Sequence, residues 1–230
     1  MQALHPSARA YSFPLILRTY DFWVLYVTNN WIWRCRTRSV LLPFYEKHIG
    51  ESAHLDVGVG TGYLPANAIE RLAKTKKIAL LDLNADTLET SEARIRRAGY
   101  KGVIEKVNQS AFDPLPESLQ GKFDSISTFY MLHCLPGSFP AKASRVFASL
   151  KAGLAPGGVF YGSTVLAKDV QHNWAGRILT WLYNRMGSFA NRGDGLDDLK
   201  KALKEHFEDV EVTLVGVVAL FVAKNPVQKP

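Results

Sequence analysis

The sequence has little cysteine, no long apolar run and no pattern of a signal peptide. Its two cysteines, Cys35 and Cys134, are far apart and have no metal-ligand spacing, so we expect reduced thiols and no metal site. No stretch reaches the roughly twenty uncharged apolar residues that cross a bilayer. The first ten residues lack a charged and apolar leader pattern, which favours the cytoplasm.

The composition favours one α/β domain with a modest appendage. The chain has 230 residues, of which 47% are hydrophobic and 21% are charged, so it can form a packed core. Its formal net charge is +7. On an enzyme such a charge most often means only a basic surface, while nucleic acid and an anionic membrane surface stay as alternative partners.

Three glycines at alternate positions follow a short apolar segment, residues 53–57. Asp56 stands in that segment, and Gly58, Gly60 and Gly62 follow it before a helical pattern over about 63–73. Glycines let the backbone turn sharply and let a ligand approach its N–H groups. The carboxyl end of a first strand is where α/β sheets bind ligands, so we expect a binding loop here.

A second acid supports a nucleoside site. Residues 78–83 form an apolar run that contains Asp82, about twenty residues past Gly62. An acid at this distance accepts hydrogen bonds from a ribose hydroxyl pair. The spacing is G-x-G-x-G rather than G-x-G-x-x-G, and Asp56 would lie close to any bound pyrophosphate. A cationic ligand therefore suits the loop better than a dinucleotide.

Together these residues resemble motif I of class I S-adenosylmethionine-dependent methyltransferases. A Pro156-Gly157-Gly158 turn before a strand at 159–164 is a second part of that pattern, and the resemblance covers about residues 53–224. It implies S-adenosylmethionine as cofactor and S-adenosylhomocysteine as product. The cofactor residues that it implies are Asp56, Gly58, Gly60, Thr61, Gly62, Asp82, Leu83 and Asn84.

In the resembled family the loop after the third strand contacts the adenine. That loop here holds Gln109, Ser110 and Ala111 after a predicted strand at 103–107. The amide of Gln109 can bond the adenine edge and Ala111 can face the ring. An ordinary polar loop is the alternative interpretation.

Three residues are candidates for contact with the methyl acceptor. The predicted strand 123–129 is followed by Tyr130 and His133, beside the place where the family transfers the methyl group. A neutral imidazole can take a proton from the acceptor, although His133 and Tyr130 can also serve only packing. Tyr20 comes from the aromatic N-terminal part. The Asn/Asp-Pro-Pro-Tyr/Phe motif of base methylation is absent, which disfavours nucleic acid.

The resemblance implies a doubly wound, Rossmann-like α/β fold with a seven-stranded, mostly parallel sheet. The last strand is expected to enter antiparallel between strands 5 and 6. We expect an aromatic-rich helical segment at 1–50, the main domain at 51–225, and a tail at 226–230. The N-terminal segment can pack on the sheet, cover the site as a lid, or associate weakly with a membrane surface.

A helical insertion at 168–195 is also expected within the main domain. Trp174 and Trp181 share its apolar stripe, which we expect to pack in the core or to line an acceptor pocket. The sequence thus predicts methyl transfer to an O or N atom of a small apolar or aromatic metabolite, in secondary metabolism. A rearrangement or cyclisation that uses the bound cofactor is the alternative. The oligomeric state stays open.

Overall fold

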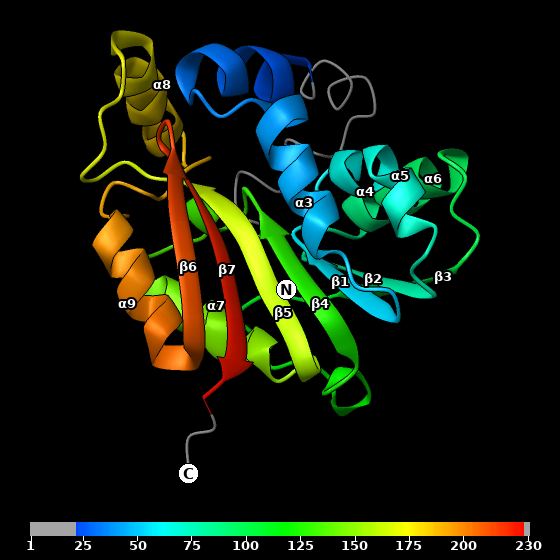
Figure 1. The fold of residues 1–230 in the computed structure, drawn as a ribbon. Helices are drawn as coiled ribbons and strands as arrows, with labels where there is room; N and C mark the ends of the chain where they lie inside the picture. Colours follow the sequence, from blue (N-terminus) through cyan, green and yellow to red (C-terminus); the bar gives the residue numbers. More distant parts are fainter. Residues whose placement is uncertain (1–21, 228–230) are drawn as a thin grey trace.

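The computed structural model describes residues 22–227, in which one seven-stranded sheet forms the centre (Figure 1). Its strand order is β3-β2-β1-β4-β5-β7-β6. The first five strands run parallel, and β7 lies antiparallel to both β5 and β6. The predicted fold class is confirmed. The strands are β1 (Ala53–Val57), β2 (Lys77–Asp82), β3 (Val103–Asn108), β4 (Phe123–Phe129), β5 (Leu154–Val165), β6 (Phe207–Val215) and β7 (Val218–Pro226).

Helices cover both faces of this sheet (Figure 1). One face carries α7 and α9, and the other carries α3 to α6. An N-terminal π-helix, η2, and helix α8 lie side by side beyond one end of the strands. The helices are η2 (Phe22–Ile32), η3 (Thr37–Leu41), α3 (Leu42–His48), α4 (Tyr63–Asn67), α5 (Ile69–Leu72), α6 (Ala85–Arg97), η4 (Glu117–Leu119), η5 (Leu132–Cys134), α7 (Ala141–Lys151), α8 (Trp174–Arg185) and α9 (Leu196–His206).

The two-residue period of β2 explains why the core has two layers. Ile78 and Leu80 are buried against α3, α5 and α6, whereas Ala79 and Leu81 are buried with α7 and α9. Successive side chains of a strand point to opposite faces, so a fully apolar strand needs helices on both sides. This burial fixes β2 in the sheet and places Asp82 at its carboxyl end, next to the exposed Leu83.

The helix predicted over about 63–73 is two short helices instead. The backbone leaves helical dihedral angles at Ala68, with ψ of 22°, between α4 and α5. Asn67 Nδ2 donates to the Tyr63 carbonyl at 2.8 Å. Such a side-chain bond competes with the backbone for a helical acceptor, and the sequence pattern does not reveal it.

The last strands are longer than the sequence predicts. β5 begins at Leu154, within the expected turn, and a shift in its register with β4 occurs between Phe123 and Ser125. Gly157 has φ of +75° and lies at this irregular start. A bulge thus replaces a simple turn.

The apolar stripe of α8 faces outward rather than lining a pocket. Trp174 and Trp181 are both exposed, which contradicts the expectation that they pack in the core or line an acceptor site. Helical periodicity shows that a helix has an apolar face but does not say which way that face points. The lid role of residues 1–50 stays a prediction, and Tyr20 lies outside the described residues.

Candidate functional site

The glycine loop between β1 and α4 has two closed positions and one open position. A Cβ on Gly58 would lie 2.8 Å from Cγ of Met131, and a Cβ on Gly62 would lie 3.0 Å from Cα of Ser91. Gly60 has no neighbouring atom within 4 Å of that position. All three have φ between +57° and +70°, a region that glycine adopts without strain. A side chain therefore has no room at Gly58 or Gly62, whereas Gly60 lies beside open space.

Asp82 lies directly beside this opening. Its Oδ1 accepts a hydrogen bond from the Asn84 N–H at 2.9 Å, and the N–H groups of Gly60 and Leu83 also bond its carboxylate. Burial raises the pKa of Asp82 to about 6, although these N–H bonds oppose the shift. The Leu83 side chain is 45% exposed next to it. The two predicted halves of the site are thus in contact.

Asp56 lies between the sheet and α3, in contact with residues of both. Its side chain is almost fully buried. Tyr45 donates to Oδ2 and Ser127 donates to Oδ1, each at 3.0 Å. Burial raises the pKa of Asp56 to about 6, and the nearby Asp82 adds to the shift. Contact between Asp56 and a cofactor stays a prediction.

A buried histidine completes the polar cluster around Asp56. His54 Nε2 lies 3.2 Å from the oxygens of both Tyr45 and Ser127. Because both hydroxyl hydrogens go to Asp56, Nε2–H donates to these oxygens and Nδ1 accepts from Ser125 at 2.7 Å. Burial lowers the pKa of His54 to about 3, so the ring is neutral. The donors thus form a chain that runs from Ser125 through His54 and the two hydroxyl groups to the Asp56 carboxylate.

Two predicted cofactor residues, Asn84 and Thr61, stabilise the loops around the site through contacts with α6. The Asn84 side chain accepts from the Asp86 N–H at 3.0 Å and so caps α6. Thr61 is buried, and Arg94 donates to its hydroxyl at 3.1 Å and to its carbonyl at 3.3 Å. These bonds hold the ends of the glycine loop and of β2. Direct cofactor contacts by the two side chains stay a prediction.

The loop after β3 ends at the same edge of the sheet. Asn108 donates to the carbonyls of Asp82 and Leu83, both at 3.0 Å, and so joins β3 to the acid loop. Ser110 Oγ accepts from the Phe112 N–H at 3.2 Å, which closes a local turn. The roles of Gln109, Ser110 and Ala111 at the adenine stay predictions. Gln109 is partly exposed and makes only long bonds to backbone carbonyls.

The carboxyl end of β4 brings Tyr130 and His133 together. Tyr130 has φ of +57°, an uncommon value for a residue with a side chain, and its hydroxyl lies beside the Cys35 thiol. The Val165 N–H donates to Nδ1 of His133 at 3.2 Å, so the neutral ring carries its proton on Nε2. Burial lowers the pKa of His133 to about 3. A base role for His133 stays a prediction, but these contacts favour a neutral ring that donates from Nε2.

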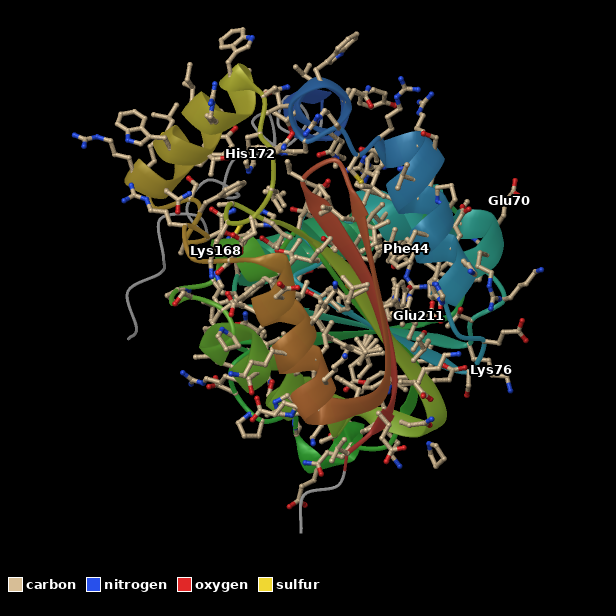
Figure 2. The ribbon with its side chains drawn as sticks, turned by 60° about the vertical axis from the view of Figure 1, so that its left-hand side comes forward. Phe44, Glu70, Lys76, Lys168, His172 and Glu211 are labelled. Carbon is tan, nitrogen blue, oxygen red and sulfur yellow. The ribbon has the colours of Figure 1, made fainter. Side chains whose placement is uncertain are left out.

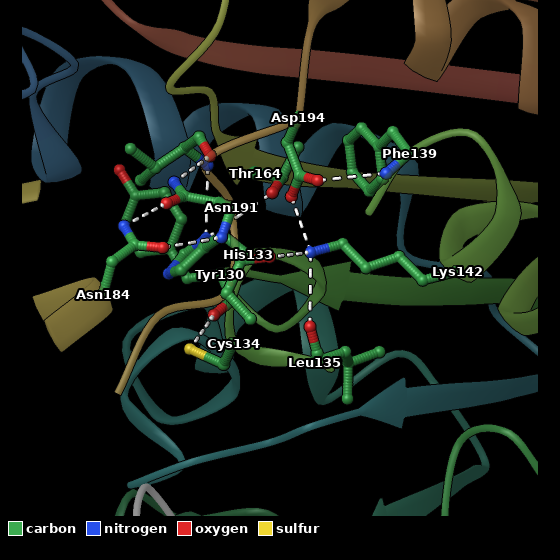
Figure 3. Close-up of polar contacts among 12 residues, drawn as sticks. Tyr130, His133, Cys134, Leu135, Phe139, Lys142, Thr164, Asn184, Asn191 and Asp194 are labelled. Atoms are coloured by element: carbon green, nitrogen blue, oxygen red, sulfur yellow. Dashed lines mark hydrogen bonds and ion pairs between the residues drawn. The ribbon is translucent and has the colours of Figure 1, made fainter. Parts of the chain in front are cut away.

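A buried ion pair, which the sequence does not indicate, connects the segments around His133 (Figure 3). Lys142 Nζ lies 2.7 Å from Oδ2 of Asp194, and neither side chain is accessible. Lys142 also donates to the carbonyls of Leu135 and Ala190, at 3.2 and 2.6 Å, and Asp194 accepts from the Phe139 N–H at 3.1 Å. The pair therefore ties the loop after β4 to the end of the 168–195 insertion.

An amide pair attaches the same insertion to β5 (Figure 3). Asn184 Nδ2 donates to Oδ1 of Asn191 at 2.8 Å, and the Asn191 N–H donates back to Oδ1 of Asn184 at 3.1 Å. Asn191 Nδ2 also donates to the Val165 carbonyl at 3.0 Å. Lysine, aspartate and asparagine are usually exposed, so nothing in the sequence indicates this buried framework.

Comparison with known proteins shows to which family this chain belongs. Residues 33–206 match the sequence profile of a family described as a methyltransferase domain. The chain belongs to this methyltransferase family. It is an S-adenosylmethionine-dependent methyltransferase, as the glycine loop and the two acids predict.

Relatives of this methyltransferase match over nearly their whole length. "Methyltransferase ctvB" of Aspergillus terreus is 40% identical over 222 residues, which cover 96% of this chain and 95% of that protein. A "Physcion biosynthesis cluster O-methyltransferase" of Aspergillus chevalieri is 39% identical over 228 residues, 98% of this chain and 99% of that one. A solved structure, a "DhpI-SAH complex", has a TM-score of 0.63 at 18% identity, covering 96% and 95%, and supports the fold.

The residues of this methyltransferase suit each part of S-adenosylmethionine. The Asp82 carboxylate can accept from the ribose hydroxyls, and exposed Leu83 can cover one face of the adenine. The open position at Gly60 leaves room for the ligand to lie against the glycine loop. The buried carboxylate of Asp56 is predicted to supply negative charge near the cationic end of the cofactor. The bound cofactor supplies a methyl group on a positively charged sulfur, and the protein aligns the acceptor with it and excludes water.

Proposed function

We propose that this methyltransferase methylates a hydroxyl group of a small, largely apolar aromatic metabolite in secondary metabolism. Relatives of nearly equal length are named O-methyltransferases, and one is named for a biosynthesis cluster. The residues beside the predicted acceptor position also support an aromatic acceptor. The His133 ring packs at a tilt against Phe189, with ring centroids 4.3 Å apart, and the Tyr130 ring lies edge-on at 5.6 Å from His133.

The protonation state of His133 supports an acceptor hydroxyl that ionises readily. Its Nδ1 is occupied and its pKa is lowered to about 3, so the ring is poorly suited to take a proton near neutral pH. A hydroxyl that ionises readily, as in an acidic phenol or enol, does not need such a base. In the proposed reaction the Nε2–H of His133 orients the acceptor oxygen, which attacks the methyl carbon after losing its proton to solvent.

A graded acceptor series tests this function. The protein is incubated with S-adenosylmethionine and small aromatic hydroxyl compounds of decreasing hydroxyl pKa, with the matching aromatic amines as controls. Mass spectrometry follows the gain of one methyl group, together with release of S-adenosylhomocysteine. We expect hydroxyl acceptors to react, and faster at neutral pH as their hydroxyl pKa falls. Methylation of the amines alone would contradict the proposal.

The same assay tests the alternative reaction. A rearrangement or cyclisation gives a product without the mass of a methyl group and without release of S-adenosylhomocysteine. That result would replace methyl transfer by a reaction in which the cofactor acts as a bound cation.

A further inference from the structure

Helix α8 turns an apolar face away from the rest of the fold. Three of its outward residues recur with helical spacing and are more than half exposed: Trp174 at 72%, Ile178 at 57% and Trp181 at 57%. Met186, just past the helix end, is 58% exposed. Trp31, at the end of η2, is 75% exposed. Exposed apolar residues gathered on one surface mark an interaction site more often than scattered ones do. We call these five residues the tryptophan face.

The two helices that carry this face are joined into one rigid unit. Asn173 Nδ2, at the start of α8, donates to the Trp31 carbonyl at 2.9 Å. Trp33 is buried between the helices, with its ring 5.9 Å from that of His172 and 6.1 Å from that of Phe189. Figures 1 and 2 show η2 and α8 side by side at the same end of the molecule. The two parts of the tryptophan face therefore lie on adjoining helices at one end of the molecule.

Nearly all of the net charge belongs to the same two segments. Residues 22–45 and 170–193 contain six arginines and no lysine, aspartate or glutamate. The rest of the chain has 22 basic and 21 acidic residues, so it is almost neutral. The six are all exposed: Arg34, Arg36, Arg38, Arg177, Arg185 and Arg192.

These arginines keep their charge available to a partner. Within residues 22–227, no ion pair joins any of the six to a carboxylate. Arg185 lies over the ring of Trp181, 5.8 Å from its centroid. An open cavity of about 280 Å³, lined in part by Trp31, Arg36 and Arg38, adjoins the face. Its size and positive charge suit an anionic headgroup.

We propose that the tryptophan face docks reversibly on the surface of an anionic lipid bilayer. Tryptophan and arginine are the residues that favour a membrane–water interface, where rings enter the headgroup layer and guanidinium groups meet phosphate. A symmetric contact with a second copy would bring Arg36, Arg38 and Arg185 of one face near those of the other, and like charges in contact oppose it. No helix among the described residues is long and apolar enough to cross a membrane, so the contact is superficial.

Vesicle sedimentation tests the electrostatic part. The full chain is mixed with phosphatidylcholine vesicles that contain or lack phosphatidylserine. We expect binding only to the anionic vesicles, and loss of binding as salt rises from about 0.1 M to about 1 M. Each basic residue near such a surface contributes about fivefold in affinity, so Arg177→Gln/Arg185→Gln should bind about thirtyfold more weakly. Lys201→Gln/Lys204→Gln, which removes the same charge from exposed positions of α9, is the matched control.

A second pair of variants tests the apolar part. Ile178→Ser/Trp181→Ser should abolish vesicle binding but leave the melting temperature and cofactor affinity unchanged, because both side chains point outward. Val103→Ser, at an exposed position of β3, should still bind. Failure of the wild-type chain to sediment with anionic vesicles would overturn the proposal. Equal weakening by the α9 control, or a dimer in place of vesicle binding that only the α8 variants dissociate, would overturn it too.

Discussion

Replacing Asp82 with asparagine should separate the stability of this methyltransferase from its cofactor affinity. Burial raises the Asp82 pKa to about 6, roughly two units above the ordinary value of an aspartate. Each unit corresponds to about 1.4 kcal/mol, so the ionised carboxylate costs the folded protein up to about 3 kcal/mol. Asp82→Asn removes this cost but also weakens the bonds from three backbone N–H groups. We expect a net gain of about 1–2 kcal/mol at pH 7.

The sign of this effect depends on pH. A carboxyl group with a raised folded-state pKa stabilises the fold below its unfolded pKa, and this contribution is lost as pH rises through the folded pKa. The advantage of Asp82→Asn should therefore be largest above about pH 6 and absent below about pH 4. Urea denaturation of the cofactor-free protein across this range measures it. Asp113→Asn, at an exposed position, is the matched control for net charge.

Cofactor affinity should change in the opposite direction. An ionised acceptor for two ribose hydroxyls is lost, and bonds to a charged group contribute about 1.5–3 kcal/mol, so titration calorimetry should show at least tenfold weaker S-adenosylhomocysteine binding. In the wild type, binding should also weaken about tenfold from pH 7 to pH 5 as Asp82 gains a proton. A variant that is less stable at pH 7 and binds the cofactor normally would refute this reasoning.

Three further variants test other parts of the site. Gly60→Ala should cost about 1–2 kcal/mol of stability, because its φ of +57° strains a residue with a side chain, and it should also lose cofactor affinity. Gly58→Ala should unfold at lower urea still, because its Cβ would in addition clash with Met131; equal effects in calorimetry and denaturation would contradict this. Lys142→Met should cost about 3–5 kcal/mol, and adding Asp194→Leu should restore part of it, as a double-mutant cycle measures. His133→Asn keeps an acceptor for the Val165 N–H, so it should stay folded, and its rate–pH profile should keep the wild-type shape; loss of a step near pH 6.5 would restore the base role.

The parts of the fold that the sequence predicts are those fixed by short-range patterns. The strands at 53–57 and 123–129 and the glycine loop depend on neighbouring residues, and each lies where expected. The position of Asp82 can also be predicted from its neighbours, because this acid ends an apolar strand. The antiparallel last strand follows from the family resemblance rather than from its own residues.

The remaining parts depend on contacts between distant segments. Asp56 is held by Tyr45 on α3 and Ser127 on β4, and the alternation of β1 alone does not say which partners it meets. From the sequence alone, Lys142 and Asp194 are expected to be exposed, and only the fold shows that they form a buried pair. The direction of the apolar face of α8 likewise depends on how Asn173, Asn184 and Asn191 fasten the insertion, and no periodicity encodes that.

The buried Lys142–Asp194 pair divides the protein into two parts that can diversify separately. The first four strands carry the groups predicted to hold the cofactor. The 168–195 insertion is attached through side chains at its ends and base, so substitutions between these points would leave the cofactor strands in place. The same segment carries much of the arginine and tryptophan surface. The surface proposed to meet a membrane could therefore change while the groups that hold the cofactor stay fixed.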